Sequence, residues 1–187
     1  MNHIPERAHF KVVYTGMPVR PNVKMLRAIP YPEITKNNPI DLLVFGGSQG
    51  AAIFSRVVPE AISLLDEKLR LRLKLVQQCR TEDFSYLKTI YQKNGVQAEV
   101  GTFFDDLPER MAKAHLVICR SGASAVAELT TIGRPAILVP YPHAIDDHQS
   151  FNAHAVDEVG GSWLIPDDAF TPERLSHRLS TLFAMPK

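Results

Sequence analysis

The chain has 187 residues, a formal net charge of +1 at pH 7 and a hydrophobic content of 45%. This length predicts one domain together with a remnant of another, and the apolar content excludes a disordered or low-complexity class. A net charge this close to zero gives no general signal for nucleic-acid binding.

The cysteines and the apolar runs indicate in which compartment the protein is found and whether it spans a membrane. Cys79 and Cys119 are far apart and show neither CxxC nor metal-ligand spacing, so both are expected to be reduced residues of a cytosolic protein. No apolar stretch reaches the length of a membrane span, and no signal peptide opens the chain. We therefore expect any membrane contact to be peripheral.

The first 39 residues are expected to lie outside the main domain. An apolar run from Phe10 to Tyr14 predicts a strand that ends in a turn at residues 15–20. Basic residues outnumber acidic ones up to residue 40, which is typical of a solvated face and gives at most a weak attraction to anionic lipid. The stretch from Pro30 to Pro39 has the composition of a linker, so the main domain is expected to start near Ile40.

Beyond residue 40, apolar runs alternate with amphipathic segments. Strands are expected at residues 42–45, 71–77, 96–100, 116–119, 136–139 and 163–165. Helices are expected at residues 52–65, 82–94, 107–114, 123–132, 149–159 and 174–183. Strands that alternate with helices through short turns predict a doubly wound, Rossmann-like parallel sheet of the α/β class.

The first expected strand runs into a glycine-rich turn, GGSQG at residues 46–50, and then into a helix. Glycines allow a tight turn and a close approach of the backbone to a phosphate group. The turn lacks the GxGxxG spacing and the Lys-Ser/Thr pair of a Walker motif, which argues against dinucleotide and nucleoside-triphosphate sites. A tight turn with glycines for packing alone is the alternative.

A second strand–turn–helix unit occupies residues 116–132. Ser121, Gly122 and Ser124 are small, so the N–H groups at the helix start stay accessible and the helix dipole favours an anion there. Glu128 follows one turn after Ser124 on the same helix face, where a carboxylate can accept two hydrogen bonds from a ribose diol. The alternative is that Glu128 is a solvated helix residue and Ser124 a helix cap. The polar loop at residues 146–149 falls at the same sheet edge, beyond the carboxyl ends of the strands.

Several motifs together strongly resemble the MurG family, the bacterial UDP-N-acetylglucosamine (UDP-GlcNAc) transferases that make lipid II from lipid I. They are GMPVR at residues 16–20, FGGSQGA at 45–51, RSGA at 120–123 with Glu128, and DHQ at 147–149 with Asn152 and Ala153. The resemblance covers nearly the whole chain but only the C-terminal half of these enzymes. It implies half of a GT-B fold, with residues 1–39 a remnant of the N-terminal domain and linker, and residues 40–187 the UDP-GlcNAc-binding domain.

The resemblance also implies a set of donor-binding residues. They are Arg20, Ser48, Gln49, Gly50, Phe104, Leu107, Ser121, Gly122, Ala123, Ser124, Glu128, His148 and Gln149. Ser48 would contact the diphosphate, Glu128 the ribose and Gln149 the sugar hydroxyls. The backbone of Phe104 would pair with the uracil edge, and Arg20 would reach the donor from the interdomain segment.

The implied reaction is an inverting transfer in which the 4-hydroxyl of the lipid I muramyl sugar attacks the anomeric carbon and UDP leaves. The partners would be the donor UDP-GlcNAc and the acceptor lipid I, the latter bound by the N-terminal domain. The protein would be cytoplasmic, peripheral to anionic membrane at the inner face of the plasma membrane, with no metal or other cofactor. The general base belongs to the N-terminal domain, so no catalytic residue is assigned, and the chain alone is expected to bind donor but barely transfer.

Other functions stay open. The chain also fits a stand-alone donor-binding subunit of a split two-chain GT-B transferase. A nucleotide-sugar epimerase of the same fold fits the GGSQG and RSGA motifs less well. A fragment that senses a sugar nucleotide without catalysis is the remaining alternative.

Overall fold

The computed structural model describes residues 16–47 and 51–184. It contains one sheet of six parallel strands in the order β3-β2-β1-β4-β5-β6. The strands are β1 (Ile40–Phe45), β2 (Leu73–Gln78), β3 (Gln97–Gly101), β4 (Leu116–Cys119), β5 (Ala136–Leu138) and β6 (Ser162–Leu164). This is the doubly wound order. The strands β1, β2 and β3 follow one another toward one edge of the sheet, and β4, β5 and β6 follow one another toward the other edge, so the strand order reverses between β1 and β4.

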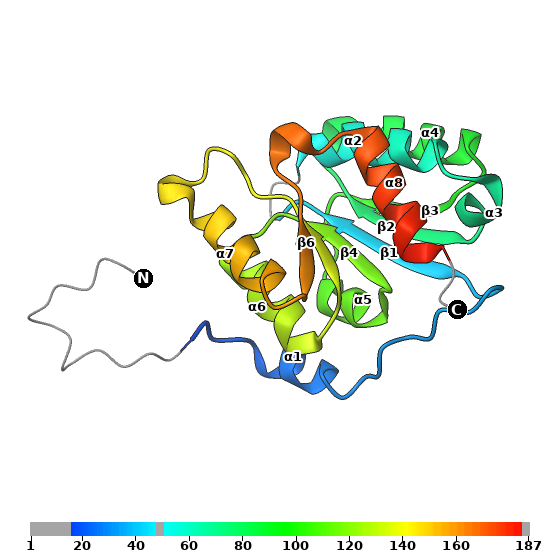
Figure 1. Cartoon of the computed structure of the whole chain (residues 1–187). Helices are drawn as coiled ribbons and strands as arrows, with labels where there is room; N and C mark the ends of the chain where they lie inside the picture. Colours follow the sequence, from blue (N-terminus) through cyan, green and yellow to red (C-terminus); the bar gives the residue numbers. More distant parts are fainter. Residues whose placement is uncertain (1–15, 48–50, 185–187) are drawn as a thin grey trace, which may run out of the picture.

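Helices cover both faces of the sheet (Figure 1). One face carries α2 (Ala52–Ser63), α4 (Phe84–Lys93) and α8 (Pro172–Phe183), and the short α3 (Glu67–Arg70) precedes β2. The other carries α1 (Pro21–Leu26), α5 (Leu107–Lys113), α6 (Ala123–Ile132) and α7 (His148–Asp157). The side chains of β1 alternate between the two cores, with Leu42 and Val44 on the first and Leu43 and Phe45 on the second.

These strands and helices confirm the predicted alternation and the α/β class. Helix α6 begins and ends at the predicted residues, and Gly133 ends it in a left-handed conformation, φ 74°. Thr171 caps α8 by accepting a hydrogen bond from the Arg174 N–H, as its sequence position indicates. Both cysteines are buried free thiols, and burial raises the pKa of Cys79 to about 11. The strand predicted at residues 10–14 lies outside the described residues.

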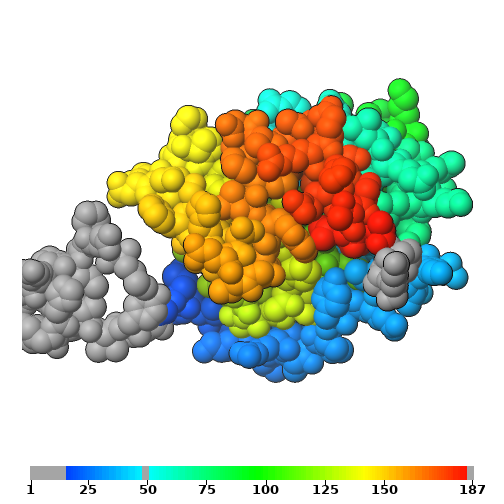
Figure 2. All heavy atoms as spheres, in the orientation of Figure 1, coloured from blue at the N-terminus to red at the C-terminus, as the bar shows by residue number. Residues whose placement is uncertain are grey.

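The segment before β1 is attached to the domain. Helix α1, which was not predicted, packs on α5 and α6 and buries Val23 completely. Residues 27–39, called the strap below, form no helix or strand but lie along the domain, as Figure 2 shows in blue. The Tyr31 hydroxyl donates to the His115 carbonyl at 2.9 Å, and the Arg72 Nε donates to the Asn38 carbonyl at 3.2 Å. The boundary near residue 40 stays a prediction.

Candidate functional site

A cleft of about 680 Å³ opens between the loop after β1 and the loop after β4. Its lining includes Gly46, Gly47, Gly122, Ala123, Ser124 and Gln149. Residues 46–47 and 122–124 come from the two glycine-containing turns, so the fold brings together the two segments that the sequence indicated separately. Among the described residues that line it, none is an aspartate, glutamate or histidine.

Two helices, α2 and α6, start at this cleft without a side-chain cap. The N-cap of α2 is Ala51 and that of α6 is Gly122, and neither position has a side-chain hydrogen bond to the helix. The first N–H groups of a helix have no partner within it and carry partial positive charge. The arrangement therefore offers two sets of backbone donors to one anion or to a linked pair of anions. It also shows that the helix-cap interpretation of Ser124 is wrong, because Gly122 occupies the cap position.

Ser121 is fully buried. Its hydroxyl donates to the Gln149 carbonyl at 2.8 Å, and its own carbonyl accepts a hydrogen bond from Asn152 at 3.0 Å. The Gln149 side-chain oxygen accepts from the Tyr141 N–H at 3.1 Å. Ser121 therefore holds the start of α7 against the end of β4 and acts on the cleft through Gln149.

Glu128 lies one turn beyond Ser124 on α6 and forms an ion pair with Arg20, with 2.9 Å between Oε1 and Nη2. The Glu128 side chain is only 16% exposed, whereas the Arg20 side chain is 62% exposed. A glutamate this covered and paired is not a solvated surface residue. The structure thus brings together two of the predicted binding residues that are far apart in sequence.

The polar loop before α7 has an unusual backbone. Asp146 and Asp147 have φ of 50° and 52°, a region that non-glycine residues seldom occupy. His148 is exposed, and its Nδ1 lies 2.7 Å from the Ile145 carbonyl oxygen, so this side chain is turned to its own loop. Within residues 16–47 and 51–184, no group of three or more His, Cys, Asp or Glu residues is arranged to hold a metal ion.

Phe104 lies in the loop after β3, and Leu107 is the first residue of α5. The Phe104 ring packs against Gly101, where an added Cβ would lie 2.7 Å from the ring, and the Arg110 guanidinium sits 4.4 Å from the ring centroid. Leu107 packs on the second core. Hydrogen bonds from Arg110 lower the pKa of Asp106, which directly precedes α5. Neither Phe104 nor Leu107 lines the cleft itself.

Two cleft arginines had no predicted role. Arg120 is 12% exposed, donates to the Pro140 carbonyl at 2.9 Å and pairs with Asp167. Arg80 pairs with Asp83, and its hydrogen bonds lower the pKa of that carboxyl group. Both arginines follow the carboxyl end of a parallel strand. Because ligands bind at that edge of the sheet, their sequence positions alone could have predicted that they lie at the site.

Three predicted residues, Ser48, Gln49 and Gly50, lie outside the described residues. Their neighbours Gly47, with φ of 87°, and Ala51 both line the cleft. The loop that would carry these three residues thus begins and ends at the cleft.

Comparison with known proteins finds a family model and longer relatives that all belong to glycosyltransferases. The model of the glycosyltransferase family 28 C-terminal domain matches residues 41–187. A UDP-N-acetylglucosamine--N-acetylmuramyl-(pentapeptide) pyrophosphoryl-undecaprenol N-acetylglucosamine transferase of Paramagnetospirillum magneticum is 52% identical over 187 residues, which is 100% of this chain and 50% of the relative. The protein of the same name from Rhodospirillum rubrum is 53% identical over 174 residues, or 93% of this chain and 45% of the relative.

The crystal structure of Acinetobacter baumannii MurG is similar, with a TM-score of 0.72 and 30% identity over 81% of this chain and 45% of that one. The chain spans about half the length of the curated relatives that it matches. No helix in the described part of the chain has the length and apolar character needed to cross a membrane.

Proposed function

The chain belongs to the glycosyltransferase family 28 C-terminal domain family, and from this membership we propose that it is the UDP-GlcNAc-binding half of the inverting transferase that converts lipid I to lipid II in peptidoglycan synthesis. Relatives of about twice its length carry the name of that transferase. The observation that carries the proposal is the cleft, in which two uncapped helix starts face a space with no described carboxylate.

The cleft suits the diphosphate of a nucleotide sugar. The N–H groups at the starts of α2 and α6 are fixed donors, and they stabilise the negative charge that builds up on UDP as its bond to the sugar breaks. Arg80 and Arg120 add guanidinium N–H groups at the same place. Their carboxylate partners, Asp83 and Asp167, offset part of their charge. Since these donors are in position before the reaction, they need little rearrangement in the transition state.

The nucleoside and the sugar would lie on either side of the diphosphate. Glu128, one helical turn from the α6 start, would accept the ribose hydroxyls, and the Phe104 backbone would pair with uracil. Gln149, which Ser121 and Tyr141 hold at the cleft, would bind the sugar hydroxyls. Residues 1–39 would belong to the N-terminal domain and the linker, and the domain that binds donor would comprise residues 40–187.

The acceptor and the general base would come from the other half of the enzyme. The acceptor 4-hydroxyl attacks the anomeric carbon, the bond from that carbon to UDP breaks, and the hydroxyl proton passes to the base. The relatives' names include undecaprenol, a lipid, which supports a position at a membrane, and we place the protein at the inner face of the plasma membrane. Exposed Lys24 and Arg27, with no acidic residue between residues 16 and 32, support an attraction to anionic lipid.

Calorimetric titration of the chain with UDP-GlcNAc, UDP-GalNAc and GDP-mannose tests the proposal. We expect saturable binding of UDP-GlcNAc, no binding of GDP-mannose, and at least about tenfold weaker UDP-GlcNAc binding by Glu128→Ala, since hydrogen bonds to a carboxylate are worth about 1.5–3 kcal/mol each. Glu60→Ala is the matched control, because Glu60 is an exposed glutamate on α2, on the other face of the sheet. Equal affinities for UDP-GlcNAc and GDP-mannose, or no binding at all, would contradict the proposal.

A further inference from the structure

We propose that Arg20 is a positioning residue that acts on the ribose of the nucleotide through Glu128. The resemblance implied only that Arg20 reaches the donor, without saying which part. This inference rests on the proposed function, in which Glu128 accepts hydrogen bonds from the ribose hydroxyls.

The ion pair is the first support. Arg20 Nη2 donates to Glu128 Oε1 at 2.9 Å, and the two residues are 108 positions apart in the sequence. Within residues 16–47 and 51–184, no other side chain donates a hydrogen bond to the Glu128 carboxylate. Among the described side chains, Arg20 is therefore the one that can orient this carboxylate.

The attachment of Arg20 is the second support. Its carbonyl accepts hydrogen bonds from the N–H groups of Val23 and Lys24, at 3.1 and 3.2 Å, as α1 begins. Helix α1 packs on α6, the helix that carries Glu128, and Val23 is fully buried there. Since Arg20 is the N-cap residue of α1 and Glu128 lies on α6, against which α1 packs, the backbone of Arg20 is already in place and only its side chain has to be ordered.

The position of Arg20 relative to the cleft is the third support. The arginines that line the cleft at the two helix starts are Arg80 and Arg120, and Arg20 is not among the lining residues. The bonded guanidinium nitrogen of Arg20 lies at Glu128, one turn along α6 from Ser124. Arg20 is thus placed for the nucleoside end of the ligand and not for the diphosphate.

The chemistry of the carboxylate allows both interactions at once. A carboxylate has two oxygens and about four positions that accept hydrogen bonds, and Arg20 uses one of them on Oε1. The remaining positions can accept both hydroxyls of a ribose diol. By fixing the carboxylate beforehand, Arg20 lowers the loss of side-chain entropy when the ribose binds.

A titration with two nucleotides tests this inference. The unaltered chain, Arg20→Ala, Arg20→Lys and Lys24→Ala are titrated with UDP and with 2′,3′-dideoxy-UDP, which lacks both ribose hydroxyls. We expect Arg20→Ala to weaken UDP binding about three- to fivefold, as suits an exposed ion pair, and to leave the affinity for the dideoxy nucleotide unchanged. Arg20→Lys should restore part of the UDP affinity. Lys24→Ala, which removes an exposed cation one turn away, should behave like the unaltered chain.

Each other outcome has a distinct meaning. An equal loss for both nucleotides in Arg20→Ala would overturn the inference in favour of a direct contact with the diphosphate. Unchanged UDP affinity in Arg20→Ala would overturn it as well. If the unaltered chain binds UDP and the dideoxy nucleotide equally well, the ribose role of Glu128 in the proposed function fails. Circular dichroism of each variant confirms that the fold is intact.

Discussion

Gly101 and Phe104 pack closely together at the proposed uracil position. A Cβ on residue 101 would lie 2.7 Å from Cζ of the Phe104 ring, and the Arg110 guanidinium also packs on that ring, 4.4 Å from its centroid. We expect Gly101→Ala to force the ring aside and to lower the free energy of unfolding by about 1 kcal/mol, the low end of the cost of overpacking, because the atom it meets is the far end of a half-buried side chain. Urea unfolding measures this loss.

The double variant Gly101→Ala/Phe104→Ala provides the control for that clash. Without the ring, the added methyl group meets no obstacle, so the cost of Gly101→Ala should nearly vanish in a Phe104→Ala background. Strictly additive losses would show that the cost comes from the strand backbone and not from the ring.

Single residues were only partly predictable from the sequence. The spacing of Ser124 and Glu128 on one helix face correctly indicated that both lie near the start of α6. The sequence could not show that Ser121 is buried, because a small polar residue suits an open anion site and a closed hydrogen-bonded turn equally well. The pairing of Arg20 with Glu128 could not be predicted from the sequence either, because it depends on how α1 packs.

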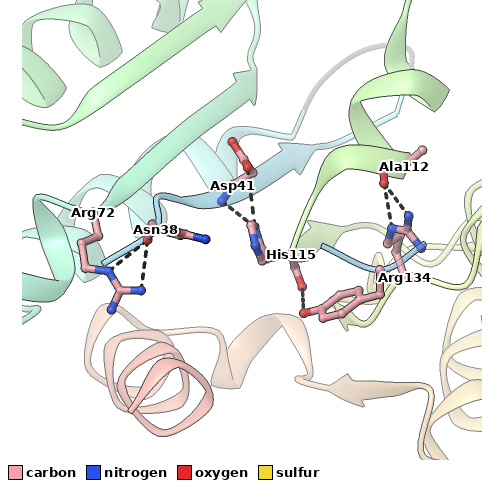
Figure 3. Close-up of polar contacts among 7 residues, drawn as sticks. Asn38, Asp41, Arg72, Ala112, His115 and Arg134 are labelled. Atoms are coloured by element: carbon pink, nitrogen blue, oxygen red, sulfur yellow. Dashed lines mark hydrogen bonds and ion pairs between the residues drawn. The ribbon is translucent and has the colours of Figure 1, made fainter. Parts of the chain in front are cut away.

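At the scale of elements, Arg134 fastens the strap to the domain through the carbonyls of Ile29 and Pro30. Figure 3 shows the other end of this contact, the hydrogen bonds from Arg134 to the Ala112 carbonyl. The side chain is 5% exposed and donates to five carbonyls, those of Ile29, Pro30, Ala112, Ile132 and Gly133. No described carboxylate pairs with it, and burial lowers the pKa of its guanidinium. The guanidinium group of Arg134 thus joins the strap, α5 and the end of α6.

We expect Arg134→Ala to lower the free energy of unfolding by about 3 kcal/mol, because several buried carbonyls lose their donors together. Arg134→Lys should lose nearly as much, since one ammonium group cannot reproduce the planar fork. The measurement is urea unfolding, in which a shift of the midpoint with an unchanged m-value reports a loss of stability. Arg27→Ala, the loss of an exposed arginine from the strap, should change little. Equal unfolding midpoints for Arg134→Ala and Arg27→Ala would refute this role.

The longer elements were predictable because apolar runs and helical periodicity determine them locally. Helix α1 was not, since six residues are too few to be stable alone and the burial of Val23 against α6 decides that it forms. Composition predicted a linker at residues 30–39, and these residues form no helix or strand, but the sequence did not show their attachment through Arg134, Tyr31 and Arg72.

At the scale of the molecule, alternating strands and helices determine a parallel sheet but not the order of its strands. The reversal between β1 and β4 places the two glycine-containing turns side by side at one edge. The later strands could instead have been added beyond β3, on the same side of β1 as β2. The turns after β1 and β4 would then have been separated. The composition of the cleft, with its two arginines, is therefore a product of topology that the separate motifs do not contain.

That composition leads to a prediction about turnover. The described lining of the cleft has donors for a leaving diphosphate but no carboxylate or imidazole that could take the acceptor's proton. A general base contributes about 10²–10⁴ to a rate, so we expect transfer of labelled GlcNAc to lipid I by the isolated chain to be at least about 100-fold slower than by an assembled enzyme. The assembled form is a fusion to the N-terminal half of the Paramagnetospirillum magneticum relative, which this chain does not span. In the fusion, Glu128→Ala should raise the KM for the donor, and Glu60→Ala should not. Steady turnover by the isolated chain at the rate of the fusion would show that the base lies within these 187 residues.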